Sequence, residues 1–318
     1  MFGIVPPEQH GHCARGKHRH CARGKHRHCA PGQHGLCGIL LGVKFIFALT
    51  VMIAYFLSDT HLGASYIKNP HEAERRLCSF LDSIKEEAEA IFLVGDILDY
   101  WYEYRYVVPR GYVRFFGKLA ELADRGIRIV WYIGNHDIWI FDYLPNELGI
   151  EVVDGYTIEE MDGRRFLVTH GDGIGRLKRS FKMLRRLFRS KTCQKMFSAI
   201  HPRWTVPFAY RWSSHSRETG SLPGAQPTLP DADRMLTNIN QFSAEMLEKD
   251  PTIDYFIYGH LHLLRRYPVP LAEEITCPAA KERDRASEIV VLGEWLHQCS
   301  YARWDGRSLT LHRYQEEA

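Results

Sequence analysis

The sequence has few cysteines beyond residue 37 and no long apolar run that is free of charge. Four of its eight cysteines follow residue 52 without the regular spacing of a disulfide framework: Cys78, Cys193, Cys277 and Cys299. This usage excludes a disulfide-stapled miniprotein and favours a reducing compartment. The chain also lacks the repeated apolar spans of a polytopic membrane protein.

One apolar stretch, residues 38–57, is long enough to suggest a membrane span. Its last six residues, 52–57, are however expected to form the first strand of the folded domain. The thirteen residues at 39–51 contain Lys44 and fall short of the roughly 20 that a spanning helix needs. Their length fits the core of a signal peptide, but no small-residue cleavage site follows, so export is the weaker interpretation.

Charge is unevenly distributed along the 318 residues, although the formal net charge is only +3. Residues 1–51 contain seven Lys or Arg and one Glu, and residues 173–217 contain twelve Lys or Arg and no acidic residue. The rest of the chain is therefore acidic, and this pattern predicts a basic surface for an anionic partner. The hydrophobic fraction of 45% suffices for a large domain and excludes a disordered polymer.

The first 51 residues contain a tandem octapeptide repeat. The unit HCARGKHR occupies residues 12–19 and 20–27, and an altered copy follows at 28–35. One interpretation is a metal-binding tract, but zinc sites use close cysteine pairs that a period of eight does not provide. We favour a low-complexity segment without a fold of its own, with Met52 as the start of the protein proper. The chain is thus divided into residues 1–51 and a folded domain at 52–318, which we expect to act without the extension.

From residue 52 onward, short apolar runs alternate with amphipathic helical patterns. Helical spacing of apolar residues is found at 72–90 and 113–124. Runs of strand length are found at 52–57, 91–94, 128–133, 165–169, 253–258, 288–292, 300–304 and 308–312. Alternating strands and helices that end in a strand-rich segment predict a layered α/β sandwich.

A polar motif follows each of the first five strands. These motifs are Ser58-Asp59-Thr60-His61, Gly95-Asp96-Ile97-Leu98-Asp99, Gly134-Asn135-His136-Asp137, His170-Gly171-Asp172 and Gly259-His260-Leu261-His262. Ligands sit at the carboxyl ends of strands in open α/β sheets, so these loops are expected to converge. Any single motif is explained as well by hydrogen-bonded loop residues, but five in one register favour a shared site. Imidazoles and carboxylates together suit Mn, Fe or Zn more than Ca or Mg.

Taken in order, the five motifs resemble the signature of the calcineurin-like metallophosphoesterases. The resemblance implies a four-layer sandwich, in which two mixed β-sheets are flanked by helices. It also implies two divalent metal ions bridged by Asp96. One ion would be held by Asp59, His61, Asp96 and His262, and the other by Asp96, Asn135, His170 and His260.

The same resemblance implies how such a site would act. Two ions about 3.5–4 Å apart share a water, lower its pKa and neutralise the phosphoryl oxygens. His136 would be the catalytic imidazole that touches the phosphate, with Asp137 or Asp99 supporting the loops. A covalent nucleophile is not required.

The basic segment lies in a long insertion, at about 174–245. Residues 176–189 place Leu177, Phe181, Leu184 and Phe188 at helical spacing, with basic residues opposite. One interpretation is a helix packed on the domain with a solvated cationic face. The other is a helical lid that touches an anionic membrane surface or an amphiphilic phosphate substrate. No recognised nucleic-acid module accompanies the basic charge, so nucleic acid is not expected as a partner. Residues 216–230, rich in Gly and Pro, are expected to form a loop of the insertion.

A narrower resemblance points to the substrate. It is carried by Gly95–Tyr104, residues 108–115, Gly134–Trp139, Thr169–Gly173 and Leu292–Trp295. These segments are similar to UDP-2,3-diacylglucosamine hydrolases of lipid A biosynthesis. That family splits the diphosphate into UMP and 2,3-diacylglucosamine 1-phosphate at the cytoplasmic membrane face, commonly with Mn²⁺. The resemblance makes four residues candidate substrate contacts: Trp101, Arg179, Lys182 and Arg186.

Two alternatives stay open. Many of these hydrolases have Arg where this chain has His136, whereas general phosphoesterases have His. The chain could therefore be another metallophosphoesterase that acts on a nucleotide, a phosphoprotein or a nucleic-acid end. A third possibility is a metal-binding scaffold without catalysis, against which the complete ligand set argues.

Overall fold

The computed structural model describes residues 51–175, 179–209, 229–270 and 286–316. The octapeptide repeat and most of the loop expected at 216–230 lie outside these ranges. The helices that the structure describes include none that is both long and apolar enough to cross a membrane.

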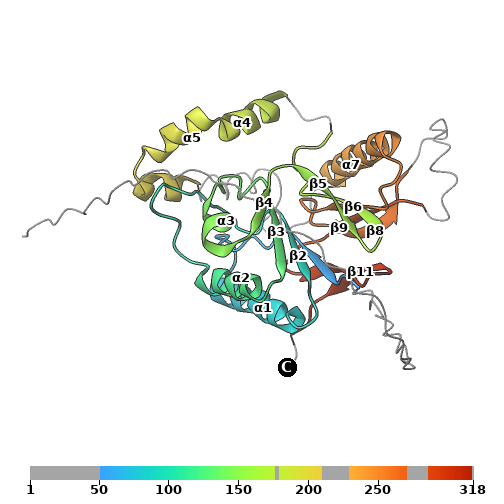
Figure 1. Cartoon of the computed structure of the whole chain (residues 1–318). Helices are drawn as coiled ribbons and strands as arrows, with labels where there is room; N and C mark the ends of the chain where they lie inside the picture. Colours follow the sequence, from blue (N-terminus) through green and yellow to red (C-terminus); the bar gives the residue numbers. More distant parts are fainter. Residues whose placement is uncertain (1–50, 176–178, 210–228, 271–285, 317–318) are drawn as a thin grey trace, which may run out of the picture. The chain divides into compact units, whose positions relative to one another are not determined.

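Two β-sheets form the framework of the domain (Figure 1). The first has the order β11-β10-β1-β2-β3-β4. Its strands are β11 (Leu309–Arg313), β10 (Ser300–Trp304), β1 (Ala54–Leu57), β2 (Ala90–Val94), β3 (Arg128–Tyr132) and β4 (Glu151–Val153). β1 to β4 pair in parallel, and β10 pairs antiparallel with β1. β2 is buried along its whole length, as expected for a central parallel strand covered on both faces.

The second sheet has the order β5-β6-β7-β9-β8. Its strands are β5 (Tyr156–Met161), β6 (Arg164–Thr169), β7 (Tyr255–Tyr258), β9 (Glu288–Leu292) and β8 (Leu264–Pro268). β6, β7 and β9 are parallel, while both edge strands run antiparallel to their neighbours. The carboxyl ends of β6 and β7 therefore open on one edge of this sheet, as those of β1, β2 and β3 do in the first.

The side chains of the strands alternate between two cores. In β1 and β2, Phe56 and Phe92 face the second sheet and stack on each other, with ring centroids 4.6 Å apart. Their neighbours Leu57 and Leu93 face the helices on the other side. This alternation follows from the two-residue period of a strand.

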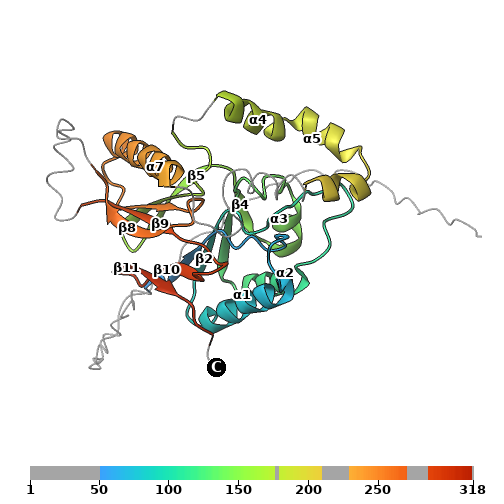
Figure 2. The ribbon, with the colours of Figure 1, turned by 180° about the vertical axis from the view of Figure 1, so that it is seen from behind.

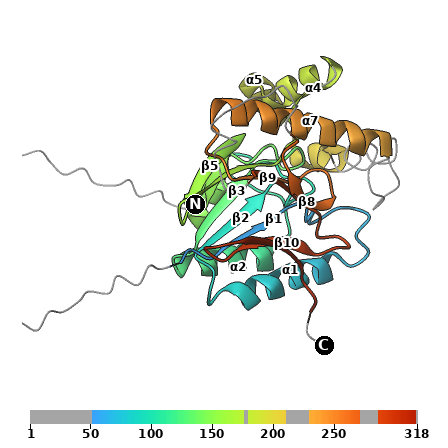
Figure 3. The same cartoon turned by 90° about the vertical axis from the view of Figure 1, so that its right-hand side faces the viewer.

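Helices cover the outer faces of both sheets (Figures 2 and 3). α1 (Pro70–Ile84) and α2 (Val113–Asp124) pack on the first sheet through residues such as Phe80 and Phe115, and the short α3 (Tyr143–Leu148) joins them. α7 (Leu229–Lys249) covers the second sheet through Ile239 and Leu247. The resulting order of helix, sheet, sheet and helix confirms the four-layer α/β fold expected from the sequence.

The insertion contributes α4 (Arg179–Arg189), α5 (Lys191–Ser198) and a helical segment at 202–209. The hydroxyl of Tyr102 donates to the carbonyl of Gln194 over 2.6 Å, and the indole N–H of Trp139 donates to the carbonyl of Phe188 over 2.9 Å. Both bonds tie the insertion to loops that follow β2 and β3. α7 lies partly within the expected insertion, yet it forms a core layer of the domain.

One predicted helix is shorter in the structure than the sequence suggested. The helix expected at 72–90 begins at Pro70 and ends at Ile84. The backbone N–H groups of Glu89 and Ala90 instead donate to the carbonyl of Ile53. These residues enter the sheet, where Ala90 begins β2, so the helical pattern could not continue through them.

Candidate metal centre

Seven predicted ligand residues come from loops at the carboxyl ends of five strands. They are Asp59 and His61 after β1, Asp96 after β2, Asn135 after β3, His170 after β6, and His260 and His262 after β7. Among them Asp59, His61, Asp96, His260 and His262 have positive φ angles, between 42° and 66°. Such backbone costs about 1–3 kcal/mol per non-glycine residue and is typical of functional sites.

A first group of ligands joins the two sheets. Asp59, His61 and His262 present donor atoms that all lie within 4.8 Å of one another. His262 Nε2 is 3.1 Å from Asp59 Oδ1 and 3.2 Å from His61 Nε2. Two imidazole nitrogens and a carboxylate oxygen thus point at one place.

A second group is centred on Asp96. Its carboxylate shares a cluster with His170 and His260, and another with His61 and His136. His170 Nε2 lies 3.3 Å from Asp96 Oδ2, while its Nδ1 is 2.9 Å from the carbonyl of Val94. That backbone contact assigns the proton to Nδ1 and leaves Nε2 as the donor atom toward the site. Asp96 therefore stands between both groups, which is the position that a bridging ligand needs.

The loop that carries Asn135 is held beside Asp96 by the two neighbours of this residue. The backbone N–H of His136 donates to Asp96 Oδ1 over 2.8 Å, and a Cβ added at Gly134 would collide with the same oxygen. Asn135 lies between these two residues, and its Oδ1 is buried. Gly95 is equally constrained, with a φ of +80° and His170 Nδ1 only 2.5 Å from the place of a Cβ.

Several atoms of the cluster fit a bound cation because no hydrogen bond satisfies them within the described part of the chain. Asp59 Oδ1, Asn135 Oδ1 and His170 Nε2 are buried without a hydrogen-bond partner. Burying such groups unpaired is costly, and a metal ion would satisfy them. Carboxylate, amide and imidazole donors are also the set that divalent transition metals accept. The residues present therefore fit divalent metal ions.

The electrostatics of the first group agree with this assignment. Burial would raise the pKa of Asp59, but the neighbouring His262 outweighs it and lowers that pKa to about 2. Burial lowers the pKa of His61 to about 4. At neutral pH Asp59 is thus ionised and His61 neutral, the protonation states that metal ligands require.

The second group has a strongly negative centre. Burial would raise the pKa of Asp96, but the imidazoles of His170 and His136 lower it well below its usual value. Conversely, burial would lower the pKa of His170, yet Asp96 raises it well above the ordinary histidine value. The carboxylate attracts positive charge at this point, a proton when nothing else is bound and a cation when one is.

Asp137 and Asp99 lie behind the ligands. The Asp137 carboxylate accepts hydrogen bonds from the backbone of Ile97 (3.0 Å) and Gly134 (2.7 Å), which joins the loops after β2 and β3. Burial raises the pKa of Asp137 to about 6. Asp99 Oδ1 lies 3.6 Å from His61 Nδ1 and 3.5 Å from His136 Nδ1. Both carboxylates are placed to orient neighbouring groups.

His136 stands at the edge of the cluster. Its Nδ1 is 3.1 Å from the carbonyl of Asp99, and its ring packs edge-on against His61 with centroids 4.9 Å apart. The side chain is 15% exposed, whereas His61 is almost completely buried. This imidazole is therefore partly open to solvent, as is that of His262.

The predicted substrate contacts are less well placed. Trp101 is completely buried in the first core and donates its indole N–H to Glu103 over 3.1 Å, so it has no surface to offer a substrate. Its assignment as a contact is corrected to a structural role. Arg179, Lys182 and Arg186 are exposed on α4. Their neighbour Arg185 instead reaches the body, where its Nε donates to Asp172 over 3.1 Å.

Arg185 was not singled out from the sequence, and Asp172 was named only as the last residue of a strand-end motif. Asp172 follows His170 by two residues and is buried, so the ion pair connects α4 to a loop of the metal centre. The motif His170-Gly171-Asp172 contained the only signal for it. Among the arginines of α4, the one that pairs with Asp172 could not be identified from the sequence. Helical spacing predicts which residues share a polar face, but not which of them contacts the rest of the domain.

The comparison with known proteins places this arrangement in a family. Residues 52–264 match the calcineurin-like phosphoesterases. A UDP-2,3-diacylglucosamine hydrolase of Porphyromonas gingivalis is 40% identical over 270 residues, which cover 82% of this chain and 97% of that protein. Proteins with the same name from Ralstonia nicotianae and Neisseria meningitidis are 26% and 25% identical, over 80% and 82% of their lengths. The expected resemblance is thereby confirmed, and the chain belongs to the calcineurin-like phosphoesterase family of hydrolases.

Proposed function

We propose that this protein hydrolyses the diphosphate bond of UDP-2,3-diacylglucosamine and releases UMP and 2,3-diacylglucosamine 1-phosphate. The observation that carries the proposal is the 40% identity to a hydrolase of that name over 97% of its length. The ligand cluster supports it, because the strand ends bring carboxylates, imidazoles and an amide into one site. These two products follow from hydrolysis of the P–O–P bridge: the water oxygen bonds to one phosphorus, and the bridging oxygen leaves with the other phosphoryl group.

The divalent ions of the centre are proposed to be Mn²⁺, with Fe or Zn as the alternatives that the donor set also accepts. Asp59, His61, Asp96 and His262 would hold one ion. The other ion would have Asp96, Asn135, His170 and His260 as ligands. When bound, such a pair supplies a water of lowered pKa and neutralises charge on the phosphoryl oxygens.

The remaining groups of the site position the substrate. His136, held at Nδ1 by the Asp99 carbonyl, directs the other side of its ring toward the place of a phosphoryl oxygen. It is proposed to act there as the imidazolium, in which both ring nitrogens are donors, so that Nε2 donates a hydrogen bond as charge develops on that oxygen. Asp137 keeps the loop of Asn135 and His136 in place through its bond to the Gly134 N–H.

The insertion is proposed to act as a lid for the acyl chains and to meet the membrane surface. Large apolar side chains are exposed on its helices and on the turn after α5: Met183, Leu187, Met196, Ile200, Trp204 and Phe208. Arg179, Lys182 and Arg186 are exposed on α4 as well. Apolar and basic side chains together are typical of segments that lie on anionic lipid surfaces. The protein would therefore work as a peripheral protein at the cytoplasmic face of the cell membrane.

Product analysis tests this proposal. The full chain is incubated with Mn²⁺ and UDP-2,3-diacylglucosamine, and the products are identified by mass spectrometry. We expect UMP and the diacylated sugar phosphate. Parallel reactions use an aryl phosphodiester, a nucleotide diester and 5′-labelled DNA. Hydrolysis of one of these without turnover of the lipid would favour another phosphoesterase activity. The histidine at position 136 supports that alternative, because general phosphoesterases have His there. A protein that binds Mn²⁺ and hydrolyses none of them would be a scaffold.

A further inference from the structure

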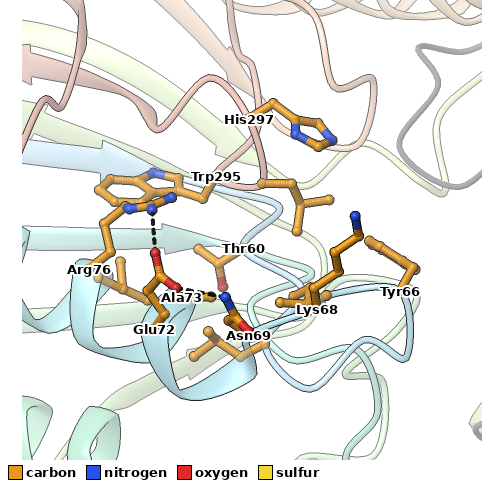
Figure 4. Close-up of a pocket in the computed structure, with 13 residues that line it drawn as sticks. Thr60, Tyr66, Lys68, Asn69, Glu72, Ala73, Arg76, Trp295 and His297 are labelled. Carbon is orange, nitrogen blue, oxygen red and sulfur yellow. Dashed lines mark hydrogen bonds and ion pairs between the residues drawn. The ribbon is translucent and has the colours of Figure 1, made fainter.

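A cavity of about 290 Å³ lies beside the metal centre (Figure 4). Its walls are the segment after β1, the first turns of α1 and the residues that follow β9. None of the assigned metal ligands lines it, and neither does any residue of the insertion. The cavity is therefore a place that the assigned chemistry and the proposed lid leave unused.

The walls of the cavity are attached to the ligands of the first metal group. Thr60, which lines it, is the residue between Asp59 and His61. The backbone N–H of Trp295 donates to the carbonyl of Asp59 over 3.2 Å. Gln298 Nε2 donates to the carbonyl of His262 over 3.2 Å. The cavity wall is thus continuous with the backbone that carries the ligands of the first metal group.

The insertion is attached to the other part of the centre. Arg185 of α4 pairs with Asp172, two residues after His170. Phe188 of the same helix accepts the indole N–H of Trp139, three residues after His136. The centre accordingly has a cavity next to one ligand group and an apolar lid next to the other. A diphosphate held between them would direct its two substituents to different places.

The lining suits a small, partly polar group. Leu62, Leu77 and Leu296 provide apolar walls, and Trp295 adds an aromatic side chain. Figure 4 shows the Lys68 amine and the His297 ring on one side of the cavity, away from Arg76. Arg76 is paired with Glu72 and Glu316, whereas Lys68 forms no ion pair within the described part of the chain. Its charge is available to an anion.

The volume decides which half of the substrate fits. Ligand pockets usually measure about 300–1,000 Å³, so this cavity stands at the small end. It can take one compact ring system with its sugar, but not two acyl chains. Apolar walls with a few polar groups are also what a pyrimidine nucleoside requires.

We infer that this cavity binds the nucleoside monophosphate half of the substrate, with Lys68 and His297 facing its polar groups. The inference rests on the proposed function, because it needs a substrate with a nucleotide at one end of a diphosphate. It adds a binding site for UMP that is separate from the lid. UMP should consequently bind to the protein by itself.

Isothermal titration of UMP into the full chain with Mn²⁺ tests the inference. Ala73→Leu fills the cavity from α1 with a good helix former, and Lys68→Ala removes the unpaired charge. We expect each variant to weaken UMP binding about tenfold or more. Inorganic phosphate, which needs only the metal centre, should bind to both as it does to the wild type. The control is Lys85→Ala at the C-terminal end of α1, a lysine that pairs with Asp82 outside the cavity, so UMP binding should not change.

The outcomes separate the two proposals. UMP binding that both variants leave intact, or no UMP binding at millimolar concentration, would overturn the cavity assignment even if the lipid is hydrolysed. If the protein does not hydrolyse UDP-2,3-diacylglucosamine but binds UMP, and Ala73→Leu selectively weakens that binding, the proposed substrate is wrong. The assignment of the nucleotide site then still holds. Thermal melting of each variant checks folding, and Lys68 is an exposed residue whose loss should not unfold the protein. Equal weakening of UMP and phosphate would place the effect at the metals and contradict the inference.

Discussion

The backbone N–H of His260 donates a hydrogen bond to Asp59 Oδ2 over 2.9 Å, although 201 residues separate the two in the chain. Asp59 follows β1 of the first sheet, and His260 follows β7 of the second. The Ser58 hydroxyl donates to the same oxygen. Oδ2 is thus occupied in joining the two sheets, and Oδ1 is left to face the metal position.

Removal of metal should lower the thermal stability of the protein. Buried donor atoms such as Asp59 Oδ1 and His170 Nε2 have no hydrogen-bond partner, so a cation that binds them stabilises the folded state. At a hundredfold excess of Mn²⁺ over its dissociation constant, we expect Tm to rise by about 5–10 °C over the chelated protein. Scanning fluorimetry checks this. A Tm that millimolar Mn²⁺ does not change would contradict the metal assignment. The control variant Asp124→Asn, an exposed change on α2, should show the same Tm shift as the wild type.

Asp96→Asn should remove metal from both positions. Its carboxylate belongs to the cluster with His170 and His260 and to the one with His61 and His136. An amide keeps the size but loses the negative charge, so we expect metal affinity and turnover to fall by more than about a hundredfold. Elemental analysis of the purified variant measures the metal content, and an aryl phosphodiester measures turnover. Normal values for both would show that Asp96 is not the bridging ligand.

Glu103→Ala should destabilise the fold without touching the metal ligands. The buried Glu103 carboxylate accepts the backbone N–H groups of Phe141 (2.6 Å) and Asp142 (2.8 Å) as well as the indole N–H of Trp101. Leaving such donors unpaired costs about 2–4 kcal/mol in the free energy of unfolding. Urea denaturation measures the loss. Glu147→Ala, an exposed change in α3, is the matched control, and an equal effect of both would argue against this role.

The convergence of the candidate ligand residues could be predicted because each of them follows the end of a strand. Parallel strands such as β1, β2 and β3 open on one edge, so motifs after each strand must meet there whatever the details of packing. Trp101 shows the limit of this reasoning. It stands two residues after Asp99, but the sequence does not tell whether its ring faces the core or the site, because that depends on the conformation of the loop after β2. In the structure, the hydrogen bond to Glu103 holds the ring in the core.

The strands that the sequence missed lie at the edges of the sheets. β4 has three residues, which are exposed or half-buried, and β5 alternates little between apolar and polar residues. Such strands bury too little surface to give a periodic apolar signal. The cavity escaped notice for a similar reason. Its wall residues Lys68 and His297 are far apart in the chain, and only packing of α1 near the residues after β9 brings them together.

Neutralising the basic face of α4 should weaken the interaction with lipid and leave the chemistry intact. Arg179, Lys182 and Arg186 are exposed, and each basic side chain near an anionic surface contributes about 1 kcal/mol. The triple change to Gln should reduce binding to vesicles with anionic lipid about a hundredfold and raise KM for UDP-2,3-diacylglucosamine, with kcat for an aryl phosphodiester unchanged. The control is the same triple change at Arg125, Lys249 and Arg307, exposed on other elements. Equal effects on the lipid and the small ester would contradict the lid role, because a segment that receives acyl chains should matter for the lipid alone.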